Sequence, residues 1–218
     1  MNSLDSRILR LGDTFAHRFT SAGTYRYTIG VHCEIATPDH HRSFEIVVAA
    51  ERGKASKTHY VTVSSAQNGL TAEPESLHIS NNDVILWSPA SAATPGFAVR
   101  GASKTATFDS ADLPANSMYS HAFGSEGVFE WRDVRDPKLN GSVTVVANSP
   151  CRSADERDAY LRKLGEATLV MIDAPKAHPK KVSVALGQTV FFAVRNGHGI
   201  SIVDRLLLVG LNPQPLPP

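Results

Sequence analysis

The amino-acid sequence predicts an all-β protein made of two β-sandwiches and one short linking helix. Most of the chain consists of short segments rich in β-branched and aromatic residues, bounded by Gly, Pro, Asn or Ser. A strand–glycine–strand pattern occurs twice, in residues 11–32 and 115–141. One segment, 149–166, instead carries the signals of an α-helix.

The two copies of this pattern place the same residue types at matching positions. The aligned pairs are Phe15 and Tyr119, His17 and His121, Phe19 and Phe123, Gly23 and Gly127, Tyr25 and Phe129, and Tyr27 and Trp131. Alternating residues on both sides of a glycine are typical of two β-strands joined by a tight turn. The sequence therefore predicts the same local structure twice.

The helix of 149–166 has a defined start and end. Ser153 and Glu156 form a capping box, in which the serine accepts from the Glu156 amide. Gly165 is placed to end the helix. The residues expected on its packed face are Tyr160, Leu161 and Leu164. We expect this helix to pack across the end of a sheet or to bridge two domains.

The strand–glycine–strand pattern resembles the C-terminal half of a cupredoxin, the copper-binding Greek-key sandwich of plastocyanin and amicyanin. In that family the second strand continues into a ligand loop, G-T-Y-x-Y-x-C-x-x-H-x-x-M-x-G. Ile29 stands at the Cys position in the first copy, and Asp133 stands there in the second. The resemblance implies two cupredoxin-like sandwiches that lack an intact blue-copper site.

A second repeat resembles the N-terminal half of the same family. Residues 168–204 parallel 60–101, each with a strand, a long connection, a second strand, a turn and an apolar strand. The resemblance therefore implies a complete cupredoxin-like domain over 58–148. It leaves one C-terminal half in 1–50 and one N-terminal half in 167–206.

An isolated half-sandwich exposes strand edges and an apolar face. We therefore expect 1–50 to pair with 167–206. Within one chain this pairing makes a circularly permuted second domain, which is favoured because tethering raises the effective concentration. Between chains it makes a swapped dimer or a head-to-tail oligomer.

The metal positions of the middle domain are degenerate. Gly96 stands at the first His position, and the loop positions for Cys, His and Met hold Asp133, Asp136 and Leu139. The two carboxylates suit a hard cation, or they are solvated and turn-forming side chains.

The paired chain ends offer a different set of candidate ligands. His198 matches the first His ligand, and His32 matches the second. Cys33, His40 and His41 lie in the same loop as His32. Imidazoles alone suit Cu(II), Zn or Ni, and a Cys33 thiolate adds a soft ligand for a single copper ion. The alternative is that these histidines are ordinary exposed residues and no metal is bound.

The loop after Cys33 also resembles the binuclear copper loop of cytochrome oxidase subunit II. Cys33 and His41 match that loop, whereas Thr37 and Phe44 replace its second Cys and its Met. A binuclear centre needs both thiolates, so only a mononuclear site from Cys33, His41 and His198 remains in this register.

Composition argues against several partners. Lysine plus arginine (22) nearly equals aspartate plus glutamate (21), and no basic stripe suggests nucleic acid. No apolar run is long enough for a membrane span. Without a signal-like segment we expect a cytoplasmic protein, unless the N-terminus is processed.

The two cysteines, Cys33 and Cys151, are free thiols, or they form one disulfide bridge, or one of them is a metal ligand. The proline-rich tail, 207–218, is expected to be extended.

No motif of a hydrolase, nucleotide-binding enzyme or zinc protease occurs in the sequence. His32-Cys33 partly matches the H-C-H motif of multicopper oxidases, but Glu34 replaces the next histidine. We therefore expect no enzyme. The favoured function is a non-catalytic interaction or structural protein, which has a protein partner or self-associates. The alternative is a mononuclear, histidine-rich copper-binding protein.

Overall fold

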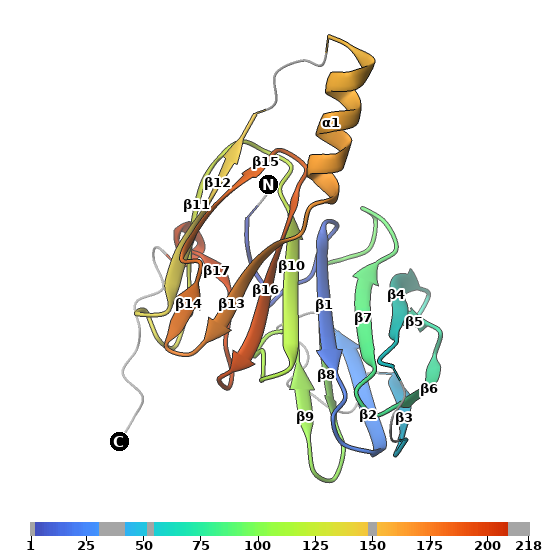
Figure 1. Ribbon diagram of the computed structural model, residues 1–218. Coiled ribbons are helices and arrows are strands. Elements are labelled where there is room, and N and C mark those ends of the chain that lie inside the picture. Colours follow the sequence, from blue (N-terminus) through green and yellow to red (C-terminus); the bar gives the residue numbers. More distant parts are fainter. Residues whose placement is uncertain (1–2, 31–41, 52–54, 148–151, 209–218) are drawn as a thin grey trace.

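The computed structural model describes residues 3–30, 42–51, 55–147 and 152–208 (Figure 1). Its strands form three sheets, of eight, five and four strands. The described residues contain one α-helix, α1 (Ala154–Gly165), and a short 3₁₀ helix, η2 (Arg205–Leu208). The predicted all-β class with a short helix is confirmed.

The eight-stranded sheet runs through the whole molecule. Its strands, in spatial order, are β14 (Lys176–His178), β13 (Thr168–Asp173), β16 (Thr189–Asn196), β10 (Ser117–Ala122), β1 (Asp13–Arg18), β7 (Val84–Pro89), β4 (Thr58–Ala66) and β5 (Gly69–Glu73). β1 and β10 are antiparallel neighbours at its middle. They are also the first strands of the two repeated patterns.

The two smaller sheets contain the remaining strands. The five-stranded sheet has the order β6 (Ser76–Ser80), β3 (Ser43–Ala49), β2 (Gly23–Gly30), β8 (Ala98–Ala102) and β9 (Thr107–Asp109). The four-stranded sheet has the order β15 (Lys181–Ala185), β12 (Asn140–Val146), β11 (Gly127–Arg132) and β17 (Val203–Asp204).

Both smaller sheets cover the same face of the large one. Phe15 of β1 lies opposite Tyr119 of β10, so both side chains point to one side. Phe15 stacks on Phe108 of the five-stranded sheet, with ring centroids 6.5 Å apart. Tyr119 stacks on Phe192, which contacts Trp131 of the four-stranded sheet. The opposite face of the large sheet is its outer face.

A pseudo-twofold relationship connects the two halves of the molecule. From the β1–β10 boundary outward, β1, β7, β4 and β5 have the same order as β10, β16, β13 and β14. The smaller sheets match in the same way, with β6, β3, β2 and β8 equivalent to β15, β12, β11 and β17. The first sandwich therefore contains β1 to β9, and the second contains β10 to β17.

This division differs from the predicted one. Of the three strands in 1–50, β2 and β3 pair with β8 and β6, and β1 pairs with β7 and β10. None of the three pairs with a strand of 167–206, so they belong with the segment that follows them. Likewise β11 and β12 pair with β17 and β15, so 58–148 is not a closed sandwich. The halves that join are neighbours in sequence, because short connections favour such pairing. The family order of N-half before C-half gave the wrong partners.

The chain ends nevertheless meet through one short segment. Asp5 forms a β-bridge with Val203, and the Asp204 amide donates to the Leu4 carbonyl at 2.7 Å. This is the place that β9 takes beside β8 in the first sandwich. β9 directly precedes β10, the first strand of the second sandwich, but it pairs within the first sandwich. The segment 4–6 precedes β1, the first strand of the first sandwich, but it pairs within the second. We call these two the leading segments, and each lies in the sandwich other than the one whose strands follow it.

The helix packs against the end of a sheet, which is one of the two placements expected from the sequence. The Glu156 amide donates to Ser153 Oγ at 3.2 Å, and the helix ends at Gly165, which confirms both signals. The Tyr160 hydroxyl donates to the Leu186 carbonyl at 2.8 Å, at the turn between β15 and β16. Leu161 is 55% exposed, so its expected place on the packed face was wrong. Of the proline-rich tail, only 207–208 are described, and they belong to η2.

Candidate functional site

The degenerate copper positions are occupied by residues that hold the fold together. Ile29 and Leu139 are buried in the core. A Cβ added to Gly96 would lie 2.5 Å from the Ile8 side chain, so this glycine allows close packing. These positions carry structure in place of metal ligands.

Asp133 organises the turn between β11 and β12. Its Oδ1 accepts from the Ser201 amide and hydroxyl, and its Oδ2 accepts from the Asp136 amide at 2.8 Å. The Asp133 amide donates to the carbonyl of buried Leu139. Because both carboxylate oxygens are used in these bonds, the geometry favours the turn-forming interpretation over a cation site.

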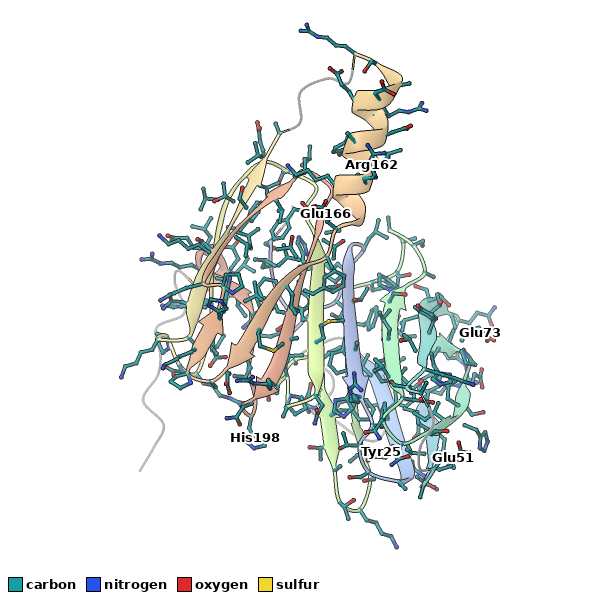
Figure 2. All side chains as sticks on the ribbon, viewed as in Figure 1. Tyr25, Glu51, Glu73, Arg162, Glu166 and His198 are labelled. Carbon is teal, nitrogen blue, oxygen red and sulfur yellow. The ribbon has the colours of Figure 1, made fainter. Side chains whose placement is uncertain are left out.

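His198 is the one candidate ligand of the chain ends within the described residues. It is exposed in the loop between β16 and β17, at the end of the molecule opposite α1 (Figure 2). The other candidates, His32, Cys33, His40 and His41, lie outside the described residues, as does Cys151. Across the described ranges, no three His, Cys, Asp or Glu side chains gather as a metal site would require.

His198 lines a cavity of about 570 Å³ at the junction of the two sandwiches. Thr28 and Ser43, close to the strand ends that border residues 31–41, line the same cavity. The opposing charges in its wall are largely paired. Arg100 Nε lies 2.6 Å from Asp109, and Arg135 ties Asp112 to the Gly199 carbonyl.

A polar cluster lies buried where β1 and β10 meet. Asp13 Oδ1 accepts from the Tyr119 hydroxyl at 2.7 Å and from His121 Nδ1 at 2.6 Å. Its Oδ2 accepts from the Arg10 amide at 2.8 Å. Burial, and then the Asp13 carboxylate, raise the pKa of Tyr119 well above its usual value, so Tyr119 keeps its proton and donates.

This cluster does not form a catalytic centre. The other ring nitrogen of His121, Nε2, is buried and has no hydrogen-bond partner among the described residues. The edge of the ring meets Phe123, with centroids 4.7 Å apart. A general base must reach a substrate proton, whereas this nitrogen faces the apolar interior. The cluster stabilises the seam between the sandwiches.

The outer face of the eight-stranded sheet carries apolar side chains across most of its width, beside polar ones such as Thr14, Arg18 and Ser120. One cross-strand row, which we call the apolar row, follows the register of six adjacent strands. Its members are Met171, Ala193, Met118, Ala16, Leu86 and Tyr60. Tyr60 is 67% exposed, and Leu169, which also lies on this face, is 45% exposed.

The apolar row contains a shallow groove of about 400 Å³. Small Ala16 and Ala193 lie on either side of Met118, which explains the hollow. Arg18 and Arg195 line one rim of the groove. The signal for this face was present in runs such as TVFFAV (189–194), which lack the alternation of a half-exposed strand.

Comparisons with known proteins identify no relative. No family model matches the chain, and no curated protein or solved structure matches it. The cupredoxin resemblance therefore remains a prediction from the sequence. Within the described ranges, the helices lack the length and apolar character needed to cross a bilayer.

Proposed function

We propose that this chain is a non-catalytic interaction protein that self-associates through the outer face of its eight-stranded sheet. The observation that carries the proposal is the apolar row, which continues across six strands of both sandwiches. Large exposed apolar surfaces mark interaction sites, because leaving them in water is unfavourable.

The face is large enough for a stable dimer. Neighbouring strands lie about 4.8 Å apart, so eight strands span roughly 38 Å, and six residues cover about 20 Å along a strand. The whole face, with its polar residues included, therefore offers on the order of 700 Å² per copy, close to the roughly 800 Å² per partner of a standard interface.

A second copy of the chain is the occupant that fits this face. Tyr60 and Leu169 are equivalent under the pseudo-twofold relationship, because each is paired with the matching residue of the next strand, Leu86 or Phe191. The face therefore presents an exposed apolar side chain on each half. An identical sheet has the same span and can pack face to face, as the sheets of a sandwich do.

The test is the mass of the protein in solution, measured by light scattering over a wide concentration range. We expect a dimer for the unchanged chain and a monomer for Leu169→Glu and Tyr60→Glu. Val128→Glu is the matched control, because Val128 is 65% exposed but lies on β11, outside this face. A monomer at every concentration, or a dimer that survives both face variants, contradicts the proposal.

Copper binding is the second candidate function. It is favoured by the position of His198, which lines the same cavity as Thr28 and Ser43. These two residues border the part of the chain that carries His32, Cys33, His40 and His41. One thiolate and several imidazoles are a ligand set suited to a single copper ion.

A Cu(II) titration of metal-stripped protein, read by electron paramagnetic resonance and visible absorption, tests this candidate. Tight one-to-one binding that is lost in His198→Ala supports it. His78→Ala is the control, because His78 is exposed on β6 of the five-stranded sheet. Binding that is weak, or unchanged in the His198 variant, removes the copper function.

A further inference from the structure

The turn between β11 and β12 encloses a small polar cavity. The cavity has a volume of about 250 Å³, and its wall includes Glu130, Arg132, Asn140, Gly141 and Arg205. A Cβ added to Gly141 would lie 2.4 Å from the Lys180 carbonyl oxygen, so a side chain does not fit there. The space is therefore bounded by fixed backbone as well as by two guanidinium groups.

Arg132 is the residue that lacks a partner in this cavity. Its Nε is buried, yet no group in the described part of the chain accepts a hydrogen bond from it. A buried N–H that stays unpaired is unfavourable, so such donors are usually satisfied by protein, water or ligand. Arg132 is also one of the residues that line the cavity, which has room for an acceptor.

The charges in the wall favour an anion. Arg205 Nη1 lies 3.0 Å from Glu130 Oε2, and this ion pair balances one of the two arginines. The second guanidinium, that of Arg132, has no carboxylate partner within the described ranges, so one positive charge remains. The Nδ2 of Asn140 already donates to the Pro137 and Lys138 carbonyls within the turn. Of these side chains, the guanidinium groups are therefore the donors that are left for an anion in this cavity.

We propose that this cavity binds a small oxyanion, a phosphate or carboxylate group, on the guanidinium of Arg132. The planar fork of an arginine presents Nε and one Nη side by side, which matches two oxygens of either group. Arg205 closes the rim and strengthens the attraction by its charge.

Among the described residues, the first sandwich does not repeat this arginine. The pseudo-twofold relationship places Thr28 at the position of Arg132 and Ser43 at that of Asn140, as the β2–β3 and β11–β12 registers show. Among the described residues at the junction cavity beside Thr28, Arg100 is paired with Asp109 and Asp112 with Arg135, and no guanidinium nitrogen is both buried and unpaired. The proposed site is therefore a property of the second sandwich.

Calorimetric titration in low-salt buffer tests the site, with inorganic phosphate in one arm and acetate in the other. We expect saturable one-to-one binding in at least one arm, weakened about tenfold or more by Arg132→Gln. Tighter binding of phosphate assigns the ligand as a phosphate group, and tighter binding of acetate assigns it as a carboxylate. Arg26→Gln is the matched control, because Arg26 is an exposed arginine on β2.

Arg132→Lys separates charge from geometry, because lysine keeps the charge and removes the Nε donor. The proposal predicts weaker binding in this variant too. Should Arg132→Gln fold poorly by circular dichroism, Arg205→Gln, at the exposed rim, provides the second measurement and is expected to weaken binding. Absence of saturable binding in both arms, or equal binding by all arginine variants, overturns the proposal.

Discussion

His121 and Asp13, which are distant in sequence, share a hydrogen bond of 2.6 Å in the buried seam between the two sandwiches. The pseudo-twofold relationship gives this bond a counterpart, because His17 is equivalent to His121 and its Nδ1 lies 2.9 Å from Ser117 Oγ. The repeated histidines seen in the sequence thus face the first residue of the opposite central strand. One copy pairs its histidine with a carboxylate, and the other with a hydroxyl.

Replacing Asp13 by Asn is expected to destabilise the fold strongly. The carboxylate accepts from Tyr119, from His121 and from a backbone amide, and an amide side chain leaves some of these buried donors unpaired. We expect a loss of about 3 kcal/mol in the free energy of unfolding, measured by urea denaturation. Asp112→Asn, at an exposed ion pair with Arg135, should cost less than about 1 kcal/mol. Equal losses would contradict this account of the seam.

Acid is expected to weaken the fold through His17. Burial lowers the pKa of His17 from 6.5 to about 4. Between these two pH values, His17 is therefore protonated in the unfolded chain and neutral in the folded chain. Stability from this residue is complete above pH 6.5 and falls toward pH 4, by about 3 kcal/mol in all. Unfolding measured at several pH values, for the unchanged chain and for His17→Gln, isolates this contribution. A difference between the two that is independent of pH between 4 and 6.5 would rule out this role.

Gly101 marks a point where the core tolerates no side chain. An added Cβ would lie 2.4 Å from the Phe108 ring and 2.7 Å from the Tyr27 Cβ. We expect Gly101→Ala to lower the unfolding free energy by about 2 kcal/mol through overpacking. Gly165→Ala is the control, because nothing lies within 4 Å of its Cβ position at the helix end. That control should change the unfolding free energy by less than about 1 kcal/mol.

Leu4 is expected to hold the leading segment in the second sandwich. It is fully buried, and its carbonyl accepts from the Asp204 amide at 2.7 Å. Leu4→Ala should cost about 3 kcal/mol and speed hydrogen exchange of the Asp204 amide. Exchange at Gly101, which pairs with Phe108 in the first sandwich as Asp204 pairs with Leu4 in the second, should change less. Unaltered exchange at Asp204 would mean that the segment is not held through Leu4.

Local structure was readable from the sequence because it depends on neighbouring residues. Alternation around Gly23 and Gly127 predicted the strands, and the Ser153–Glu156 box predicted the helix start. The sequence did not show which half-sandwiches pair with each other. Both copies of each half have the same pattern, and either pairing would bury their apolar faces. The segments that decide, such as 4–6 and 107–109, are too short to carry a periodic signal.

The candidate sites were harder to predict than the fold. The contact between Asp13 and His121 depends on the register of two strands far apart in sequence. The unpaired Nε of Arg132 depends on the folding of the adjacent turn. Sequence reasoning identified His198, which does line a cavity, but the motif positions Asp133 and Leu139 proved to serve the turn and the core.

The placement of the segment 4–6 also bears on the order in which the protein can be assembled during synthesis. The first sandwich has all its strands once residue 109 has left the ribosome. The second needs β17, near the end of the described chain, before Leu4 and Asp5 find their partners. Residues 4–6, which precede every described strand, are therefore among the last segments to dock. We expect a slow final step, since contacts between distant parts of a chain form late.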